Sequence, residues 1–444
     1  MNITYKMAQF IHETTFKDLP DNIVQKAKLA LLDWLGVTLA GSTHESSKLL
    51  FNTIDCFSGR KQATVLGYGK RMDIFSASLL NGYFSHVLDF DDCYNGMLGH
   101  PSAPILPAIL ALGEWQKKSG KEFILAFVLG VDLECRMGDA VNPQHYDHGW
   151  HSTSTLGHFG AAVGASKLLN LDTDKIVHAI GIAGTLASGV RQVFGTMCKP
   201  LHPGKAAMNG LLAAVLAGQG FTSSREMLGG EKSFTSVLCS NKFDLEALTF
   251  EIGQKWKVDE IIFKKYASCY RTHAVIECIL SLRQQQRLNP EEIASIHCRI
   301  PPIALNHAGI IIPKTGLEGK FSQPYCAAIA CMEGEAMDQQ FTDEKVGSPV
   351  ICGLIEKTKL EVDNHLGPAE AVVKIQLLNG NSYVERKDLE KIFTTEDEVF
   401  TNLKEKFQRL VSPIITDEES NDLLVTIMNL DAVKDVTALT KLCL

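Results

Sequence analysis

Apolar residues recur at helical spacing along the chain up to about residue 260. Between residues 21 and 41, Ala27, Leu31 and Leu35 recur every four positions, and Asp21 stands where a helix N-cap is expected. Later segments are rich in Ala, Gly and Leu, and such small residues let helices approach one another closely. The pattern therefore predicts the interior helices of a large bundle. Further helices are expected at residues 73–88, 104–117, 121–139, 155–169, 173–190 and 203–219.

The pattern changes after about residue 263. Residues 293–300 form a β-branched run of strand length, and residues 373–377 alternate apolar and polar side chains. The Asn379-Gly380 pair that follows is typical of a two-residue β-hairpin turn. Helical spacing returns from about residue 396. These changes predict strands in one part of the chain and helices on both sides of it.

We therefore expect three parts in a chain of 444 residues, which is long for one hydrophobic core. Residues 1–262 form a helical domain, residues 263–395 form a smaller α+β domain, and residues 396–444 form helices that pack back on the first domain. The expected fold class is mainly α with α+β, in which a large all-helical domain carries a smaller α+β domain inserted before the C-terminal helices.

The composition is that of an ordinary globular protein, with 45% hydrophobic and 21% charged residues. The net charge of −8 gives no reason to expect nucleic acid or an anionic membrane as a partner. No apolar run has the length of a membrane span, and the N-terminus lacks the layout of a signal peptide. Twelve cysteines without paired spacing indicate reduced thiols and a cytoplasmic location.

The stretch LDFDDCYNGMLGHPSAP, residues 88–104, places three aspartates close to a histidine and beside apolar segments. Asp89, Asp91, Asp92 and His100 form a candidate metal site, but the zinc spacings are absent and hard metals need more converging oxygens. An alternative gives Asp91 to capping and Asp92 to solvent. Asp89 ends the apolar segment HVLDF, where a buried carboxylate needs a partner and can orient a histidine.

Four histidines lie in the segment HYDHGWHSTSTLGH. On a helix the first three would spread over about 300°, which is unsuitable for binding one metal ion, and Gly149 argues against a helix there. We expect a loop that carries one functional histidine, with structural hydrogen bonds for the others. The four are His145, His148, His151 and His158.

Two further segments carry positive charge in this acidic protein. Arg191, Lys199, His202 and Lys205 lie within fifteen residues, where they form either an anion site or a solvated basic face. The segment FKKYASCYRTHAVIEC adds more basic residues and Cys269, a residue type that more often serves packing than catalysis. Its basic residues are Lys264, Lys265, Arg271 and His273.

Together these residues suggest a pocket with histidines, one or two carboxylates and several cations. No Gly-rich phosphate loop, nucleotide fingerprint or Ser/His/Asp elbow occurs in the chain, so we expect neither a cofactor nor a metal. Such a set suits proton transfer at a carbon next to a carboxylate, because cations stabilise the negative charge that develops there.

The order of several motifs resembles that of the MmgE/PrpD family, which includes 2-methylcitrate dehydratase, cis-aconitate decarboxylase and iminodisuccinate epimerase. The resemblance covers nearly the whole chain. It implies a large helical domain, a smaller α+β lid domain, a homodimer and a reaction on a small carboxylate substrate without metal or cofactor. The motifs are HVLDFDD, HPSAPILPAILALGE, GWHSTSTLGHFGAAVGASKLL, GTMCKPLHPGKAA, KKYASCYRTHAVIE and FSQPY.

The resemblance also implies roles for individual residues. Asp89 corresponds to the active-site carboxylate, His100 and His151 to the proton-transferring histidines, and Lys199 and Lys264 to carboxylate-binding cations. Asp91 and Asp92 are expected to cap or shape the loop. The remaining candidates are expected to bind substrate, with the tyrosine reaching it from the lid: Cys93, Lys205, Arg271 and Tyr325.

Two departures leave the substrate open. Cys93 follows DFDD, where the tricarboxylate-acting members commonly have Thr, and Cys269 stands near a position where the decarboxylase branch has a histidine. We therefore expect a lyase of a short di- or tricarboxylate, acting by dehydration or decarboxylation. An epimerase or isomerase using the same α-proton chemistry is the alternative, and a binding protein that kept the fold without catalysis is a third.

Overall fold

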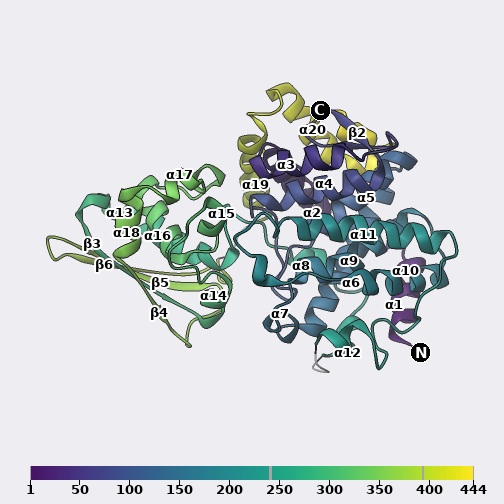
Figure 1. Ribbon diagram of the computed structural model, residues 1–444, viewed down its shortest axis with the longest axis horizontal. Helices are drawn as coiled ribbons and strands as arrows, with labels where there is room; N and C mark the ends of the chain where they lie inside the picture. Colours follow the sequence, from purple (N-terminus) through teal and green to yellow (C-terminus); the bar gives the residue numbers. More distant parts are fainter. Residues whose placement is uncertain (1, 240–242, 393–394, 444) are drawn as a thin grey trace.

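The computed structural model describes residues 2–239, 243–392 and 395–443. The chain folds into a large helical lobe and a smaller lobe that contains a sheet (Figure 1). The described part is thus mainly α with α+β elements, as the sequence predicts. No helix among the described residues is long and apolar enough to cross a membrane.

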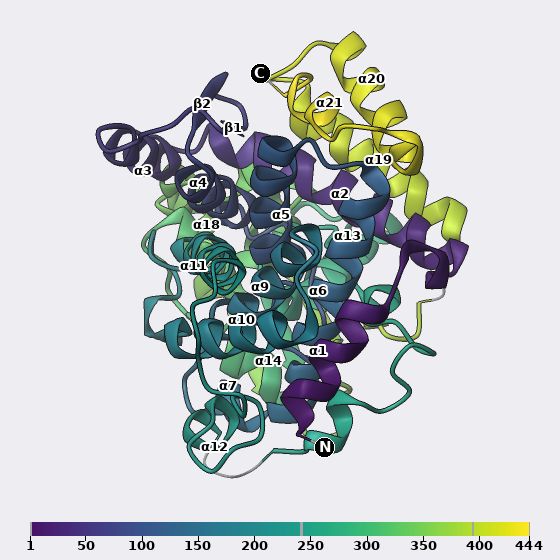
Figure 2. The same ribbon diagram turned by 90° about the vertical axis from the view of Figure 1, so that its right-hand side faces the viewer.

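The large lobe is built from helices that pack around α5 and α9, whose residues are almost all buried, and a short antiparallel pair of strands lies at its edge (Figure 2). Its helices are α1 (Ile3–Glu13), α2 (Asp21–Ser42), α3 (Glu45–Asp55), α4 (Ile74–Val87), α5 (Ser102–Gln116), α6 (Gly120–Val141), α7 (Gln144–Asp147), α8 (Ser152–Thr155), α9 (Gly157–Leu168), α10 (Thr173–Leu186), α11 (Leu201–Gly218) and α12 (Phe234–Leu238). Its strands are β1 (Ala63–Val65) and β2 (Lys70–Met72).

Small residues bring α4 and α11 into close contact. A Cβ atom added at Gly82 would lie 2.6 Å from the Cα of Gly204, which is too close for any side chain. The two helix backbones therefore pack directly on each other. Because His86 lies one turn further along α4 and Lys199 lies just before α11, this contact brings both side chains to one place.

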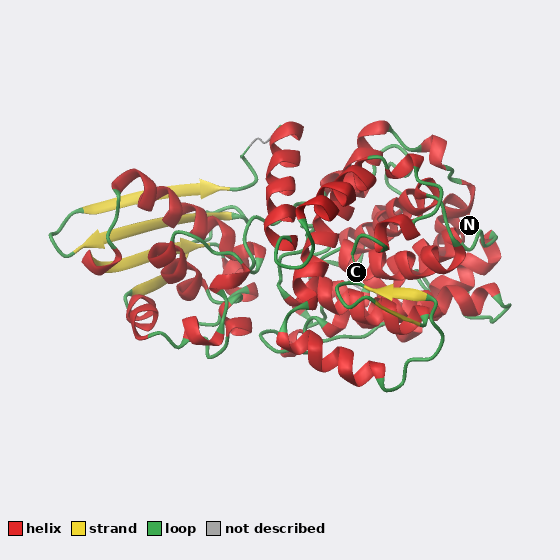
Figure 3. Cartoon of the chain, turned by 90° about the horizontal axis from the view of Figure 1, so that it is seen from above, coloured by secondary structure: helices red, strands yellow, loops and turns green. Residues whose placement is uncertain are grey.

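The smaller lobe contains a four-stranded mixed sheet in the order β4-β3-β5-β6. β3 pairs in parallel with β4 and antiparallel with β5, and β5 pairs antiparallel with β6. Helices cover one face, with α13 against β5 and β6, and α16 and α18 beside β4 (Figure 3). The elements are α13 (His273–Gln286), β3 (Ile293–Ile300), α14 (Pro302–His307), α15 (Gly316–Gly319), α16 (Gln323–Glu333), α17 (Asp343–Val346), α18 (Pro349–Glu356), β4 (Thr358–Val362), β5 (Glu370–Leu377) and β6 (Ser382–Asp388).

The C-terminal segment returns to the large lobe as helices α19 (Glu396–Val411), α20 (Asp417–Met428) and α21 (Thr437–Thr440). α19 and α20 pack on α2, at the upper edge of the large lobe in Figure 1. The chain therefore leaves the large lobe, forms the sheet and comes back. The domain boundaries at residues 262/263 and 395/396 stay predictions.

Most of the predicted elements are present in the structure. The strand at residues 293–300 is confirmed, and Val373, Ile375 and Leu377 lie buried on one face of β5, before a hairpin in which Gly380 has a φ of 89°. The prediction that Asp21 is an N-cap is wrong. Pro20 occupies that position with an extended backbone, so the carboxylate of Asp21 lies in the first helical turn.

Candidate active site

A pocket opens where the α4–α5 loop of the large lobe meets the beginning of the smaller lobe. It encloses about 480 Å³, including its open mouth. Charged groups lie on its floor and aromatic rings form part of its wall. It is lined by Asp89, Cys93, Tyr94, Asn95, Leu98, Gly99, His100, Tyr146, His151, Phe194, Lys199, Cys269, Tyr270, Arg271, His307 and Phe321.

Asp89 lies on the floor of the pocket, two residues after the end of α4. It adopts a left-handed backbone conformation with a φ of 51°, which turns the chain sharply away from the helix axis. Its Oδ1 is 2.6 Å from the Nζ of Lys264, and its Oδ2 is 3.3 Å from the Nζ of Lys199. Burial alone would raise the pKa of Asp89, but attraction to Lys199 and Lys264 holds it well below its ordinary value. The carboxylate is therefore ionised and paired with two cations.

His86, on α4, connects Lys199 to a second carboxylate. Its Nδ1 lies 2.8 Å from Oδ2 of Asp91, and its Nε2 lies 2.7 Å from the Nζ of Lys199. Burial lowers the pKa of His86, so the ring is neutral. A neutral ring that donates from Nδ1 to a carboxylate accepts at Nε2. The chain Asp91–His86–Lys199 thus fixes one tautomer of His86 and aims the ammonium of Lys199.

His100 is held by the backbone of the same loop. Its Nδ1 donates to the carbonyl oxygen of Asp92 at 2.7 Å, which leaves Nε2 as an acceptor. Nε2 lies 3.9 Å from Oδ1 of Asp89. Burial lowers the pKa of His100 to about 3, in spite of the nearby carboxylate of Asp91. The free protein therefore presents a neutral imidazole whose acceptor nitrogen lies beside Asp89.

His151 lies across the pocket, immediately before α8. Its Nδ1 is 2.9 Å from Nδ1 of His202, so one of these nitrogens donates and the other accepts. Its ring packs edge-on against Phe194, with centroids 4.9 Å apart. Burial and the neighbouring His202 hold the pKa of His151 well below its ordinary value. The rings of His100 and His151 both lie near His86, at centroid distances of 4.6 and 5.9 Å.

The alternative that gives Asp91 to capping and Asp92 to solvent is wrong, whereas the bonds of Asp92 agree with the expectation that it shapes the loop. Asp92 is buried, not solvated, and its carboxyl oxygens accept from the backbone N–H and hydroxyl of Ser102 at the start of α5. Burial raises the pKa of Asp92 to about 8. Asp91 bonds His86 instead of capping a helix, and its pKa is lowered by His100 and His86 although burial opposes this.

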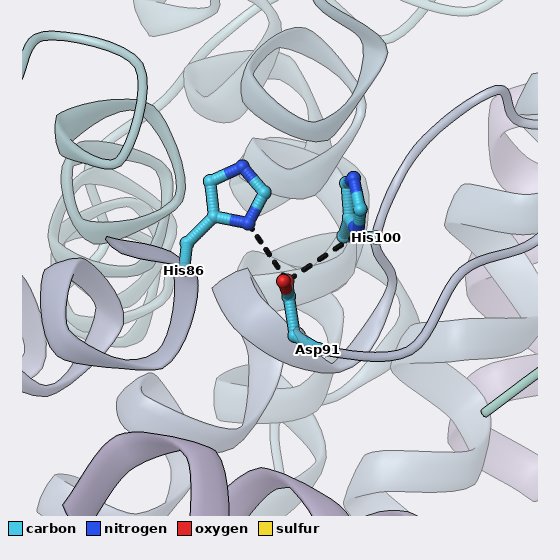
Figure 4. A group of neighbouring side chains, drawn as sticks. All are labelled: His86, Asp91 and His100. Carbon is cyan, nitrogen blue, oxygen red and sulfur yellow. Dashed lines mark hydrogen bonds and ion pairs between the residues drawn. The ribbon is translucent and has the colours of Figure 1, made fainter. Parts of the chain in front are cut away.

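His86, Asp91 and His100 are also the one group of described residues with the spacing of a metal site, since their ligand atoms lie within 4.8 Å of one another (Figure 4). The hydrogen bonds point to another use. Nδ1 of His100 faces the carbonyl of Asp92 and therefore carries a hydrogen, which occupies the position that a metal would need. Oδ2 of Asp91 accepts a hydrogen bond from Nδ1 of His86 at 2.8 Å and lies 3.4 Å from Nδ1 of His100.

The structure brings most of the predicted site residues to this pocket. Asp89, Cys93, His100, His151, Lys199 and Arg271 line it, and Lys264 contacts Asp89 from behind. Arg271 also donates to the carbonyl of Pro368 and to Asn95. Burial raises the pKa of Cys93 to about 12, so its thiol is protonated.

Two predicted substrate-binding residues are not among those that line the pocket. The ammonium of Lys205 bonds the carbonyl oxygen and hydroxyl of Ser188. Tyr325 is buried within the smaller lobe, where its hydroxyl donates to the carbonyl of Gln340 at 2.5 Å. Among the histidines of the segment 145–158, His145 and His158 are buried and bonded to Thr155 and Ser154, as the structural interpretation expects.

Sequence reasoning missed other residues of the site. His86 stands three residues before Asp89 in an apolar helix, and a buried imidazole in such a place signals a partner. The aromatic wall of Tyr146, Phe194 and Phe321 has no local signal, because the three come from distant segments. Phe194 and Phe321 flank Lys199, whose Nζ lies 5.4 and 5.1 Å from their ring centroids.

The described part of the chain thus combines a helical lobe, a smaller α+β lobe and a pocket in which a carboxylate lies between two lysines beside neutral histidines. The chain belongs to the MmgE/PrpD family. The MmgE/PrpD N-terminal domain matches residues 5–246, and the MmgE/PrpD C-terminal domain matches residues 266–432.

Relatives are similar over nearly their whole length. A cis-aconitate decarboxylase-like protein of Aspergillus oryzae is 28% identical over 99% of this chain and 97% of its own. The cis-aconitate decarboxylase of Homo sapiens is 27% identical over 99% and 94%. That of Aspergillus terreus is 24% identical over 99% and 95%.

Proposed function

We propose that the protein is a cofactor-independent lyase that removes CO₂ or water from a short di- or tricarboxylate. The observation that carries this proposal is the geometry around Asp89, where Lys199 and Lys264 hold the carboxylate while His100 stands beside it with a neutral ring. The relatives named as cis-aconitate decarboxylases favour decarboxylation of an unsaturated tricarboxylate over dehydration.

The pocket suits such a substrate electrostatically. Lys199 and Arg271 line it and offer cations to the carboxylates of the substrate, and Asn95 adds an amide. A bound polyanion raises the pKa of any imidazole that it touches, because the nearby negative charge favours the protonated ring. His100 and His151 are neutral in the free protein, and each becomes an acid only when the anion arrives. We propose that the substrate itself prepares the proton donor.

The decarboxylation balances with one proton. The electron pair of the breaking C–CO₂ bond forms a new carbon–carbon double bond, and the former double bond takes up a proton at its far carbon. An imidazolium supplies this proton, and the released CO₂ leaves a product with one carboxylate fewer. Lys199 stabilises the negative charge that develops on the remaining carboxylate, since a preorganised cation in a water-poor site needs no reorganisation.

The test is ¹H and ¹³C NMR of the protein in D₂O with cis-aconitate, citrate, 2-methylcitrate and iminodisuccinate in separate tubes. Decarboxylation gives one solvent deuterium in a five-carbon product, and dehydration gives an alkene with six or seven carbons. Deuterium exchange at an unchanged centre identifies an epimerase instead. The proposal is refuted if the wild-type protein turns over none of the four, or only exchanges a proton.

Two variants connect any turnover to this pocket. His100→Gln and His151→Gln keep a polar side chain but remove the titrating ring, and each is expected to lower kcat by about 10²- to 10⁴-fold. His158→Gln is the control, because His158 is also a buried histidine but donates to the Ser154 carbonyl outside the pocket lining. Full activity in both pocket variants would show that the reaction takes place elsewhere.

We further propose that the protein is cytoplasmic and homodimeric and that its three parts divide near residues 262 and 395. The twelve cysteines are free, which suits a reducing compartment. Light scattering after size-exclusion chromatography tests the dimer, and limited proteolysis tests the division.

A further inference from the structure

Three consecutive carbonyl groups at the floor of the pocket each accept a hydrogen bond from a different buried lysine. Lys320 donates to the carbonyl of Leu88 at 2.7 Å. Lys264 donates to the carbonyl of Asp89 at 2.8 Å, and Lys406 donates to the carbonyl of Phe90 at 2.7 Å. The backbone of residues 88–90 is therefore hydrogen-bonded to three ammonium groups.

The three lysines come from different parts of the chain. Lys320 follows α15 in the smaller lobe, and Lys264 lies between the two lobes. Lys406 lies on α19, which returns from the smaller lobe to pack on α2 (Figure 1). Segments far apart in the sequence thus meet at the backbone that carries Asp89.

Lys320 and Lys406 each make a second backbone contact on the segment that carries Lys264. Lys320 also donates to the carbonyl of Ala267 at 2.9 Å, and Lys406 also donates to the carbonyl of Lys264 at 3.1 Å. Each ammonium therefore joins segment 88–90 to segment 264–267. One of these segments carries the carboxylate of the Asp89–Lys264 ion pair and the other carries its cation.

The partners of the two lysines fit a positioning role. Neither lines the catalytic pocket. Lys320 is buried against the ring of Phe341, at 4.6 Å from its centroid, and donates hydrogen bonds to two carbonyl groups. Lys406 also pairs with Asp33 of α2 at 2.6 Å. Burying an ammonium group costs free energy unless each of its N–H donors has a hydrogen-bond acceptor. A buried lysine therefore favours the one backbone arrangement that keeps its acceptors in place.

We propose that Lys320 and Lys406 are positioning residues that staple the two segments together and so hold Asp89 in its left-handed conformation against Lys264. The staple joins the smaller lobe and α19 to the pocket without touching substrate. The expected change in kcat rests on the proposed function, whereas the expected change in the geometry of Asp89 does not.

The test uses Lys320→Met and the double variant Asp33→Asn/Lys406→Met. Methionine keeps most of the side-chain length without the donors, and Asn avoids leaving the carboxylate of Asp33 unpaired. Two controls match them elsewhere in the fold. Lys357 of the smaller lobe donates to the carbonyl of Ile293, and Lys28 of α2 is buried, donates to the carbonyl of Met428 and pairs with Asp431. The controls are therefore Lys357→Met and Lys28→Met/Asp431→Asn.

The first measurement is the crystal structure of each variant. We expect both staple variants to lose the left-handed φ of Asp89, or to lengthen its Oδ1–Nζ contact with Lys264 from 2.6 Å to beyond hydrogen-bonding distance. Both controls are expected to keep this geometry. Unchanged Asp89 geometry in the two staple variants would overturn the proposal, whether or not the protein has any turnover.

The second measurement is kcat and KM of each variant for whichever of the four compounds in the NMR test the wild-type protein consumes. The melting temperature of each variant is measured as well. We expect kcat of the staple variants to fall about 10²-fold, because displacing a group near the reacting atoms has an effect of this size. KM is expected to change much less. The controls are expected to lose similar thermal stability but to keep kcat. Equal kcat losses in staple and control variants would reduce the effect to general destabilisation and overturn the proposal. A displaced Asp89 with full kcat would show that turnover does not depend on the Asp89–Lys264 pair and would overturn the kinetic part of the proposal.

Discussion

Asp92 provides a test of the site that needs no substrate. Its carboxyl is buried and bonded to Ser102, and burial raises its pKa from the ordinary 3.8 to about 8. The folded protein therefore holds Asp92 protonated at neutral pH, whereas the unfolded chain ionises it. Stability from this group is fully present below pH 3.8 and is lost as the pH rises toward 8.

The Asp92→Asn variant removes this dependence. Asparagine has the shape of a protonated carboxyl, accepts from the Ser102 N–H and donates to the Ser102 hydroxyl, and does not titrate. Each pH unit between the two pKa values costs the wild-type protein about 1.4 kcal/mol, so the variant gains roughly 2 kcal/mol at pH 5 and roughly 4 kcal/mol at pH 7. With an unfolding entropy of about 0.9 kcal/mol/K for a chain of this length, the variant should melt about 2 °C higher at pH 5 and about 5 °C higher at pH 7.

Differential scanning calorimetry of both proteins at one scan rate measures this gap. The widening of about 3 °C between pH 5 and pH 7 is the decisive quantity, because any constant packing difference cancels. Asp91→Asn is the matched control. The pKa of Asp91 is lowered, so the stability that it contributes is complete above pH 3.8, and its melting deficit should not change between pH 5 and pH 7. A gap for Asp92→Asn that stays constant or narrows would show that Asp92 is ionised in the folded protein and would refute the reasoning.

Further predictions concern activity on whichever carboxylate the NMR screen identifies. Asp91→Asn should lower kcat about 10³-fold, because the amide no longer fixes the His86 tautomer that accepts from Lys199. Steady-state kinetics measure this loss, and Asp92→Asn, which should keep activity, is the control. Since burial lowers the pKa of His100 to about 3, the pH profile of kcat/KM should show no inflection from this ring near pH 6.5, and its titration there would contradict a neutral His100. Lys205→Met should leave kcat and KM within about twofold of wild type, because its ammonium bonds Ser188 outside the pocket lining; a tenfold rise in KM would restore its predicted role in substrate binding.

Much of the fold could be predicted from the sequence because it depends on spacing. The apolar period located α2, α4, α5, α6, α9, α10 and α11 to within a few residues but did not predict α1 or α3, and the change of period at about residue 263 marked the sheet-containing lobe. The N-cap of α2 was misplaced by one residue, since Pro20 and Asp21 both suit a helix start. Local composition does not decide between such neighbours.

The site was harder to predict because its chemistry depends on contacts between distant segments. Asp89 was found from its place at the end of an apolar run, but its left-handed backbone conformation was not. Asp91 and Asp92 are adjacent in the sequence and burial raises the pKa of both, yet His100 and His86 outweigh burial at Asp91, whereas burial prevails at Asp92. Lys406 did leave a signal, since it lies on the buried stripe of α19 with Leu403, Phe407 and Leu410.

The crossing of α4 and α11 at Gly82 and Gly204 has a consequence for interpreting mutational screens. A methyl group at Gly82 meets backbone, which cannot rotate away, so the helices must separate by about 1 Å to reach ordinary contact distance. That displacement is passed to His86 and Lys199 at the neighbouring helix ends. An alanine at this crossing should therefore lower activity as the loss of His86 or Lys199 would, although both side chains are still present.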